Sequence, residues 1–298
     1  MASRASRTAE FMALFRALET VRRPRQARLF EDPLARGFLG AGLRAVQLAA
    51  CAPLVGGLVP RLIDRRWPGA RSSGVARTRL IDDALRAAIE DGISQVVLLG
   101  AGFDGRAWRL PALEGARVFE LDRPATLAAK RAPLRGRAPR SRLHAFVETD
   151  FRAGAWPAAL EQAGYRRGER AFFVWEGVTN YLTPEAVDEV LRWIGGSAGG
   201  SRLLFTYVHR GVLDGSEAFW GTERLFATLQ RSQERWTFGL DPRELRARLA
   251  ARGLELLEDL GASEYRERYL GPEGAHERGY AFYRAALVAV SGGAPCRR

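Results

Sequence analysis

The chain has 298 residues, of which 47% are hydrophobic and 27% charged. These proportions exclude global disorder and leave room for one large α/β domain or two small domains. The formal net charge is +12, but Lys130 is the only lysine, and the arginines are spread along the whole chain among acidic residues. We expect a composition bias and no nucleic-acid partner, because phosphate-binding residues gather on one face.

Cysteine and histidine are both scarce. Cys51 and Cys296 lie far apart, so they form neither a disulfide framework nor a zinc-binding pattern. The three histidines, His144, His209 and His276, are too scattered for a metal cluster. We therefore expect a protein of the reducing cytoplasm that binds no metal.

The first quarter of the chain is predicted to be a helical cap over residues 1–75. Its start is basic and polar, and it lacks the apolar core and cleavage site of a signal peptide. Phe11, Leu14, Phe15 and Leu18 have helical spacing.

One apolar stretch of this region, residues 38–59, approaches the length of a membrane span, which is about 20 residues. Arg44 and Gln47 lie in its middle, however, and Pro53 followed by Gly56 interrupts it. We expect a buried helix followed by a loop, and no membrane span.

Further along, short apolar strands alternate with amphipathic helices. Residues 68–74 (PGARSSG) are predicted as a loop, and residues 75–90 as a helix that Gly92 ends. Seven strands follow, most of them continuous apolar runs, as expected when both faces of a sheet are buried. Their predicted ranges are 95–99, 116–121, 143–149, 171–175, 202–208, 254–260 and 280–290. The alternation predicts an α/β, Rossmann-like fold whose mostly parallel sheet carries helices on both faces.

Two later helices have clear start signals. Thr183 can cap a helix over residues 184–194, which has Pro184 in its first turn. Asp241 is predicted to cap the start of another helix, and Gly253 is predicted to end it. The last two strands, joined by a polar loop, are expected to form an antiparallel hairpin at the sheet edge.

These elements predict a division of the chain. After the cap, residues 76–292 are expected to form the sheet domain. Residues 210–240 are expected to be a lid inserted after the fifth strand, and residues 293–298 a disordered tail.

The strongest local signal is LLGAGFDG at residues 98–105, which follows a buried strand and opens a helix. Gly100 allows a tight turn, and Gly102 lets the backbone approach a ligand without a Cβ in the way. Asp122, at the end of the next strand, can accept hydrogen bonds from ribose hydroxyls. With Gly105 the glycines spell G-x-G-x-x-G, which suits NAD as well as S-adenosylmethionine; a glycine turn that only packs strand on helix is the structural alternative.

Acidic residues stand just past the ends of the first four strands: Asp104, Asp122, Asp150 and Glu176. Ligands of open α/β sheets bind at that edge, although a single carboxylate there can equally cap a helix. Four in succession favour a shared ligand that is rich in donors or positively charged. This description fits S-adenosylmethionine, whereas the pyrophosphate of NAD would be repelled.

With these motifs the chain resembles the leucine carboxyl methyltransferase family, in particular its bacterial branch of S-adenosylmethionine-dependent O-methyltransferases. The resemblance spans about residues 9–260 in the family's order and is more specific than the glycine pattern. The matching segments are ALFRALETVRRPRQARLFEDPLA, VARTRLIDDAL, QVVLLGAGFDGRAWRL, VFELDRPATLAAK, ETDFR, FFVWEGVTNYL and WTFGLDPRELRARLAARG.

The resemblance implies roles for residues that match the family's motifs. Arg77 would pair with the carboxylate of the methionine moiety, because a guanidinium forms such a bidentate pair well. Arg79, or a solvated role for Arg77, is the alternative. The other implied cofactor contacts are Gly100 through its backbone, Asp122 on the ribose, Asp150 and Phe151 around the adenine, and Glu176 near the methionyl group.

The family usually carries a small hydroxyl residue where this chain has Gly105, which keeps an NAD-dependent oxidoreductase as an alternative. The segment FFVWEGVTNYL at residues 172–182 has no place in the dehydrogenase pattern and argues against it. A non-catalytic cofactor-binding protein on the same fold is the third alternative.

The expected activity is O-methylation of a small molecule, with a carboxylate as the first choice of acceptor and a hydroxyl as the second. A carboxylate is ionised near neutral pH, with a reference pKa of about 4, and needs no base, whereas a phenol, at about 10, would benefit from one. His209, at the end of the fifth strand, is the candidate base, and Tyr181 is a candidate for the acceptor pocket. Both also have ordinary structural explanations.

An acidic acceptor would need a cationic partner. Arg210 or the region 22–25 could supply it, and three aromatic residues of the lid could line an apolar pocket, although core packing explains them equally well. These aromatic residues are Trp220, Phe226 and Trp236.

Overall fold

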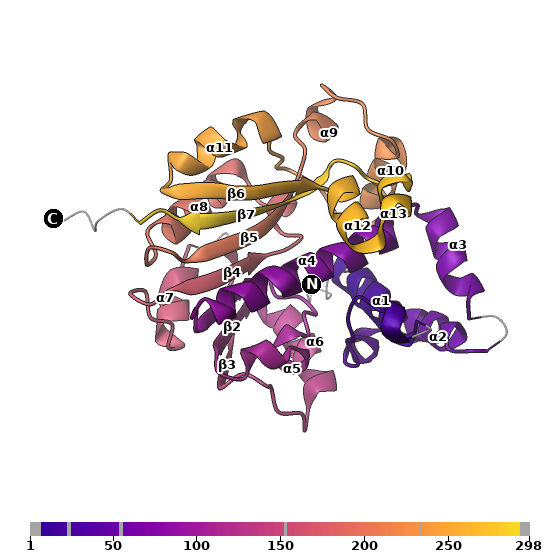
Figure 1. Ribbon diagram of the computed structural model, residues 1–298, viewed down its shortest axis with the longest axis horizontal. Coiled ribbons are helices and arrows are strands. Elements are labelled where there is room, and N and C mark those ends of the chain that lie inside the picture. The colour runs from indigo at the N-terminus through magenta and orange to yellow at the C-terminus, as the bar shows by residue number, and fades with distance from the viewer. Residues whose placement is uncertain (1–6, 23–24, 54–55, 152–153, 233, 293–298) are drawn as a thin grey trace.

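The computed structural model describes residues 7–22, 25–53, 56–151, 154–232 and 234–292, and shows one seven-stranded sheet with helices on both faces (Figure 1). The strands are β1 (Gln95–Leu99), β2 (Arg117–Asp122), β3 (Leu143–Glu148), β4 (Ala171–Trp175), β5 (Arg202–Val208), β6 (Leu254–Gly261) and β7 (Tyr283–Val290). Their order in the sheet is β3-β2-β1-β4-β5-β7-β6. The first five strands are parallel, and β7 is antiparallel to both of its neighbours, β5 and β6. The predicted fold class is confirmed; the predicted tail at 293–298 lies outside the described residues.

Two apolar cores sandwich the sheet, because alternate residues of each strand point to opposite faces. In β1, Val97 and Leu99 belong to one core and Val96 and Leu98 to the other, and all four are almost completely buried. The first core is covered by α7 (Trp156–Gln162), α8 (Pro184–Gly195) and α11 (Pro242–Ala250). The second is covered by α4 (Ala70–Glu90), α5 (Arg106–Arg109) and α12 (Ala262–Leu270). A strand buried on both sides carries apolar residues throughout, which is why these strands were recognisable from sequence.

The N-terminal helices form a separate layer beside the sheet. They are α1 (Arg7–Val21), α2 (Ala41–Ala50) and α3 (Leu58–Arg66), with the 3₁₀ turns Arg25–Ala27 and Ala35–Phe38 between them. Leu14, Phe15 and Leu18 of α1 are buried in a third core, as their helical spacing predicted. The boundary expected between residues 75 and 76 falls inside α4, so the cap and the sheet share this helix.

The remaining elements surround the carboxyl end of β5. They are α9 (Gly211–Asp214), α10 (Thr222–Ser232) and α13 (Pro272–His276), while α6 (Pro124–Leu134) connects β2 to β3. Leu225 and Leu229 of α10 pack with Val208 and Phe282 in a fourth, smaller core. Thr183 caps α8 by accepting a hydrogen bond from Ala186, as predicted.

Two predictions about the cap were wrong. Residues 70–74 begin α4 and are not a loop. Gly74 packs against α1, where a Cβ would lie 3.0 Å from the terminal methyl of Met12, and Ser73 accepts a hydrogen bond from Arg266 of α12 at 3.1 Å. Small residues therefore serve close helix packing here. The expected buried helix within 38–59 is α2, but Leu48 is 60% exposed and Gln47 is the buried residue, because α2 packs on the molecule along one side only.

The connection between the last two strands also differs from expectation. β6 and β7 pair antiparallel at the sheet edge, as predicted, but the polar segment that joins them forms α12 and α13. Tyr265 of α12 is completely buried under the sheet, so this segment contributes to the second core. β7 begins at Tyr283, three residues later than expected, because Tyr280 and Phe282 pack into the fourth core instead.

Candidate functional site

The sheet order places a natural site beside the carboxyl end of β1. From β1 the chain moves outward through β2 and β3, then crosses back to β4 on the other side of β1. Such a reversal leaves a crevice at the carboxyl ends of the two central strands, where open α/β sheets bind their ligands. The predicted residues that follow β1, β2 and β4 therefore share one edge.

The glycine turn after β1 has a conformation that only glycine adopts readily. Gly100 has φ of 71° and Gly102 has φ of 47°. A Cβ on Gly100 would lie 2.4 Å from Cγ2 of Val178, so space as well as backbone conformation excludes a side chain. The backbone N–H groups of Gly100 and Ala101 both donate to the carbonyl of Leu121, at 2.8 and 2.9 Å, which anchors the turn to β2.

Asp122 lies directly against this turn. Its Oδ2 accepts a hydrogen bond from the backbone N–H of Gly102 at 2.7 Å, and its Oδ1 accepts one from the N–H of Arg123. The N–H of Thr149 donates to the backbone carbonyl of Asp122 at 2.9 Å and brings the end of β3 to the same place. Asp150 follows Thr149, so three of the predicted segments converge here.

Arg77 and Glu176 form an ion pair across the crevice. Nε of Arg77 lies 2.8 Å from Oε1 of Glu176, and the two side chains are 10% and 19% exposed. Burial opposes the charge of Glu176, but Arg77 and Arg106 outweigh it and hold the pKa of this carboxyl below its usual range. Burial likewise opposes the charge of Arg77, and the attraction of Glu176 raises the pKa of the guanidinium. Both groups are therefore charged at neutral pH.

Three residues that sequence reasoning missed surround Arg77. Met12 of α1 places its sulfur 3.6 Å from Nη2 of Arg77. Tyr265 is buried and Tyr283 is partly buried, which raises the pKa of each hydroxyl, although the nearby charge of Arg77 acts in the opposite direction. Nothing in the sequence marked these residues, because they come from α1, α12 and β7, far from the glycine motif.

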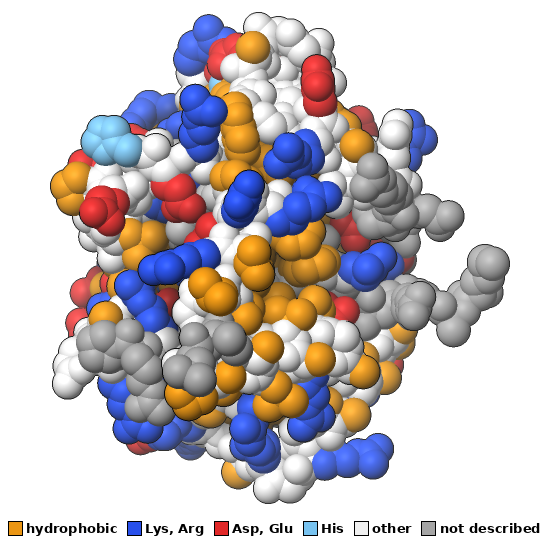
Figure 2. Space-filling model, turned by 90° about the vertical axis from the view of Figure 1, so that its right-hand side faces the viewer, with side chains coloured by type: hydrophobic (Ala, Val, Ile, Leu, Met, Phe, Trp, Pro, Cys, Tyr) orange, Lys and Arg blue, Asp and Glu red, His pale blue; other side chains and the backbone are white. Residues whose placement is uncertain are grey.

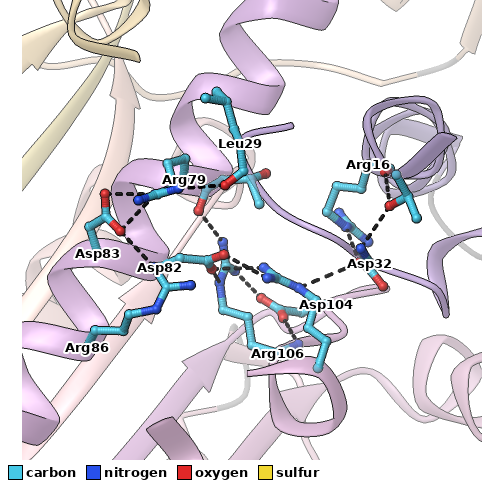
Figure 3. A network of polar contacts seen from close by, with 12 residues as sticks. Arg16, Leu29, Asp32, Arg79, Asp82, Asp83, Arg86, Asp104 and Arg106 are labelled. Atoms are coloured by element: carbon cyan, nitrogen blue, oxygen red, sulfur yellow. Dashed lines mark hydrogen bonds and ion pairs between the residues drawn. The ribbon is translucent and has the colours of Figure 1, made fainter. Parts of the chain in front are cut away.

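Arg106 forms ion pairs with several carboxylates around the site. It contacts the carboxylates of Asp82 and Asp104 (Figure 3). Its Nη1 lies 3.6 Å from Oε2 of Glu176. Burial opposes the charge of Asp104, but Arg106 more than compensates and lowers the pKa of Asp104 to about 2. Asp104, one of the four acids at the strand ends, therefore forms an ion pair with Arg106 within the protein.

This network continues into the N-terminal cap. Asp82 also binds Arg109, with nitrogen–oxygen distances of 2.7 and 2.8 Å. Asp32 receives a hydrogen bond of 2.9 Å from Arg16, which in turn donates to the backbone carbonyl of Phe103 inside the glycine turn. The cap is thus bonded directly to the segment that shapes the site. Arginines are so frequent in this chain that their number gave no signal for these positions.

Gly105 faces the same network. A Cβ at this position would lie 3.1 Å from Oδ1 of Asp32, which is tighter than ordinary contact. The departure of Gly105 from the family's small hydroxyl residue therefore has a local packing explanation in the cap.

Phe151 is almost completely buried, with 8% of its surface exposed, and its ring lies 5.9 Å from that of Trp156. It packs against the first core immediately after Asp150.

Tyr181 lies in a 3₁₀ turn, Thr179–Tyr181, after β4, and connects two parts of the molecule. Its hydroxyl donates to Oε2 of Glu234 at 3.0 Å, and the hydroxyl of Thr8 donates to the same oxygen at 2.9 Å. Burial and the charge of Glu234 raise the pKa of Tyr181. The phenol is therefore protonated at neutral pH and suited to donate a hydrogen bond.

His209 is held at the end of β5 by the segment that follows it. Its Nδ1 accepts a hydrogen bond from the N–H of Gly211 at 3.0 Å, and its Nε2 lies 3.6 Å from Oε1 of Glu217. Its ring packs 5.2 Å from that of Phe219. These contacts lie on the lid side of β5, so the structure does not bring His209 into contact with the Arg77–Glu176 pair.

The alternative cationic residues have other partners. Arg79 binds Asp83 and donates to the carbonyl of Leu29 at 2.7 Å, which ties α4 to the cap (Figure 3). Arg210 forms a fork with Glu244, at 3.0 and 3.1 Å. Of the region 22–25, residues 23–24 lie outside the described residues.

Two aromatic residues of the lid, Trp220 and Trp236, pack against aromatic residues in the segment 280–283, where β7 begins. Phe226 and Trp236 adjoin the fourth core, and Trp236 lies 5.5 Å from the ring of Tyr283, which borders Arg77. Trp220 is 42% exposed and lies 6.3 Å from Tyr280. Core packing accounts for two of the three, and Trp236 also extends towards the site.

Within the described ranges, no three histidine, cysteine or acidic side chains are arranged to hold a metal ion. None of the helices in the same ranges is both long and apolar enough to cross a membrane.

The glycine turn after β1 and the acidic residue after β2 suit a cofactor that carries a ribose, and comparisons with known proteins show the class of protein. The leucine carboxyl methyltransferase family matches residues 9–195. A relative from Frankia alni is 38% identical over 213 residues, covering 70% of each chain, and one from Streptomyces coelicolor is 40% identical over 209 residues with the same coverage. Both are assigned to the S-adenosyl-L-methionine-dependent methyltransferases.

The solved structures add evidence on the fold. A protein from Thermobifida fusca, described as a methyltransferase, has a TM-score of 0.59 at 19% identity and covers 89% of this chain and 94% of its own. A protein from Streptomyces avermitilis has a TM-score of 0.57 at 17% identity, with coverage of 89% and 96%.

The chain belongs to the leucine carboxyl methyltransferase family. It is a methyltransferase whose cofactor is S-adenosylmethionine.

Proposed function

We propose that the protein is a cytoplasmic O-methyltransferase that methylates a small molecule, with a carboxylate as the acceptor of first choice and a hydroxyl as the second. In this proposal the cap of residues 1–75 and the 210–240 segment cover the acceptor side of a cofactor-binding domain formed by residues 76–292.

The buried pair of Arg77 and Glu176 is the observation that carries the cofactor roles. The methionine moiety of S-adenosylmethionine presents a carboxylate and an ammonium group, and a guanidinium beside a carboxylate is the complementary arrangement. In our proposal Arg77 binds the carboxylate and Glu176 contacts the ammonium. Both side chains are charged, and their 2.8 Å contact holds them beside each other. Neither therefore needs a change of protonation to bind the cofactor.

The glycine turn and Asp122 suit the nucleoside part of the cofactor. The left-handed glycines fix the path of the turn, and Val178 fills the space that a Cβ on Gly100 would take. In our proposal Gly100 contacts the cofactor through its backbone. Asp122 is fixed by the N–H of Gly102, and each carboxylate oxygen has a second lone pair that can accept from a ribose hydroxyl. We assign Asp150 and Phe151 to the adenine.

The bound sulfonium supplies an activated methyl group, so the protein's task is orientation and exclusion of water. Arg77, Glu176 and Asp122 would orient the cofactor, and the cap would exclude water. A carboxylate acceptor requires no general base. Tyr181, with its raised pKa, is proposed as a hydrogen-bond donor in the acceptor pocket, and it would exchange its bond to Glu234 for one to the acceptor. His209 is proposed as the base only if the acceptor is a hydroxyl, and it would need to leave Glu217 to reach it.

Calorimetric titration with S-adenosylhomocysteine, with NADH in parallel, tests the cofactor site. We expect micromolar binding of the first and none of the second. Asp122→Ala should weaken binding by about 1–3 kcal/mol, as for loss of hydrogen bonds to a charged group. Arg77→Lys should also weaken it, because an ammonium cannot reproduce the guanidinium fork. Arg79→Lys is the matched control, since Arg79 lies on the same helix but binds Asp83 and Leu29.

The assignment of Arg77 fails if Arg77→Lys and Arg79→Lys bind equally well. Unchanged affinity of Asp122→Ala would remove the ribose role.

The class of acceptor is tested by the chemistry of the product. Incubation with methyl-labelled S-adenosylmethionine and a panel of small carboxylic acids and phenols would be followed by mild alkali, which hydrolyses methyl esters to volatile methanol and leaves methyl ethers intact. Release of labelled methanol supports the carboxylate acceptor. Alkali-stable label shows a hydroxyl acceptor instead, and a pH profile that His209→Gln abolishes would then identify the base.

A further inference from the structure

The outer side of α2 and α3 exposes large apolar side chains. Leu48, Leu58 and Leu62 are 60%, 50% and 65% exposed, and they are the three most exposed large hydrophobic residues in the described part of the chain. Figure 2, which views the molecule from the side where α2 and α3 lie, shows hydrophobic side chains gathered together with arginines around them. A contiguous apolar patch on a folded protein usually marks an interaction surface.

The sequence of α3 places leucine and arginine on one face of the helix. Leu58, Arg61, Leu62 and Arg65 are all exposed and follow the spacing of neighbours on a helix surface. A short helix that combines exposed leucines with arginines, and that is polar on average, is typical of segments that lie in the interface of a membrane.

Two hollows adjoin this face and share Leu62. A groove of about 300 Å³ between α2 and α3 is lined by apolar residues: Val46, Ala49, Val59, Leu62, Ile63 and Trp67. A cleft of about 520 Å³ between α3 and α10 contains three arginines, Arg65, Arg66 and Arg224. The surface therefore offers an apolar trough beside a cluster of cationic groups.

The charge of this region is positive and largely uncompensated. Residues 33–63 contain neither Asp nor Glu. Asp64 is engaged by Arg71 at 2.6 Å, so it does not neutralise its neighbours on α3. Within the ranges that the structure describes, Arg61 and Arg65 have no carboxylate partner, whereas most arginines of the sheet domain do.

We propose that α2 and α3 dock the protein onto the surface of a membrane that contains anionic lipids. The leucines would enter the boundary between headgroups and acyl chains, and the arginines would bind lipid phosphates. Apolar contact alone would suit a neutral partner; the arginines that surround the leucines select an anionic one. The docking is peripheral, since none of the described helices could span a membrane. The proposal goes beyond methyl transfer and is independent of which acceptor is methylated.

Co-sedimentation with large unilamellar vesicles tests this surface in the full-length protein. We expect binding to vesicles of phosphatidylcholine with phosphatidylglycerol, and much weaker binding to phosphatidylcholine alone. The double variant Leu58→Glu, Leu62→Glu should abolish binding. Arg61→Gln with Arg65→Gln should lower the partition coefficient by roughly tenfold or more, because each basic residue near an anionic surface adds to binding.

Leu257→Glu is the matched control. Leu257 is 47% exposed on β6, which lies across the molecule from α3 (Figure 1), so this change should leave vesicle binding intact. All substituted residues are exposed, and circular dichroism should show unchanged folding for each variant.

Three results would overturn the proposal. The first is absence of binding to anionic vesicles, and the second is equal binding to neutral and anionic vesicles. The third is a loss of vesicle binding in Leu257→Glu as large as that in the Leu58→Glu, Leu62→Glu variant. Sedimentation velocity without lipid provides the competing outcome: if the wild type dimerises through Leu58 and Leu62 and ignores vesicles, the face is an interface between two copies. Binding of S-adenosylhomocysteine measured on the same samples keeps this result separate from the proposed activity.

Discussion

Replacing Gly100 by alanine would test the physical basis of the turn that shapes the cofactor site. Two separate costs are expected. The left-handed conformation of Gly100, with φ of 71°, costs an L-residue about 1–2 kcal/mol. The new Cβ would also lie 2.4 Å from Cγ2 of Val178, and overpacking of this kind typically costs about 1–3 kcal/mol more.

A double-mutant cycle with Val178→Ala separates the two costs. This second change removes Cγ2, and the remaining Cβ of Val178 would lie 3.6 Å from the new methyl group, which is ordinary contact. By itself Val178→Ala should cost about 1 kcal/mol, because two partly buried methyl groups are lost. In its presence Gly100→Ala should cost only the conformational part, so the coupling energy between the two sites should be about 1–3 kcal/mol.

Urea unfolding followed by circular dichroism measures all four proteins, and calorimetry with S-adenosylhomocysteine reports on the site. We expect Gly100→Ala to weaken cofactor binding and Val178→Ala to restore it in part. If Gly100→Ala costs the same free energy of unfolding in both backgrounds, steric overlap with Val178 is not the reason for glycine. If it costs nothing in either, the conformational argument fails as well.

Two other side chains give predictions of a different kind. Asp104 has a folded pKa of about 2, below its ordinary value of 3.8, so the stability it contributes is present above about pH 4 and is lost as the pH falls towards 2. Asp104→Asn should therefore be less stable than the wild type at pH 6 by about 2 kcal/mol. This difference in the free energy of unfolding, measured from urea midpoints, should narrow in acid. A difference that is constant with pH would contradict the assigned pKa. Tyr181→Phe removes the hydrogen bond to Glu234 and should cost about 1 kcal/mol, equally at pH 7 and pH 9, because the phenol is protonated at both. A stability difference that disappears between these two pH values would show that Tyr181 ionises there.

The sheet was predictable from the sequence because its signals are local. Residues 96–99 and 171–175 are uninterrupted apolar runs, and the strands that contain them, 95–99 and 171–175, have the predicted bounds. The segment 68–74 was predicted wrongly for the same reason. Its glycine and serine residues locally favour a loop, and only the contact of Gly74 with α1 explains why it is helical.

The site was predictable in outline but not in its supporting contacts. The glycine turn, Asp122 and Glu176 each follow a strand, so their convergence at one edge follows from the parallel sheet. The family resemblance favoured Arg77 over Arg79 as the partner of the methionine carboxylate, and this role stays a proposal. The structure shows that the two residues of the same helix have different partners, Glu176 for Arg77 and Asp83 for Arg79. Met12 and Arg106 could not be found, because their contacts with the site depend on how distant segments pack.

The bond from Arg16 to the carbonyl of Phe103 has a consequence for the order of folding. The two residues are 87 positions apart in sequence, and such distant contacts form late because a long loop must close first. The pairing of β1 with β2 joins residues much closer in sequence, such as Gln95 and Arg117, so the turn after β1 can form before it receives this constraint. We expect α1, the first of these helices to be synthesised, to be among the last to dock, so that the protein becomes competent for its cofactor only after the rest of the chain is in place.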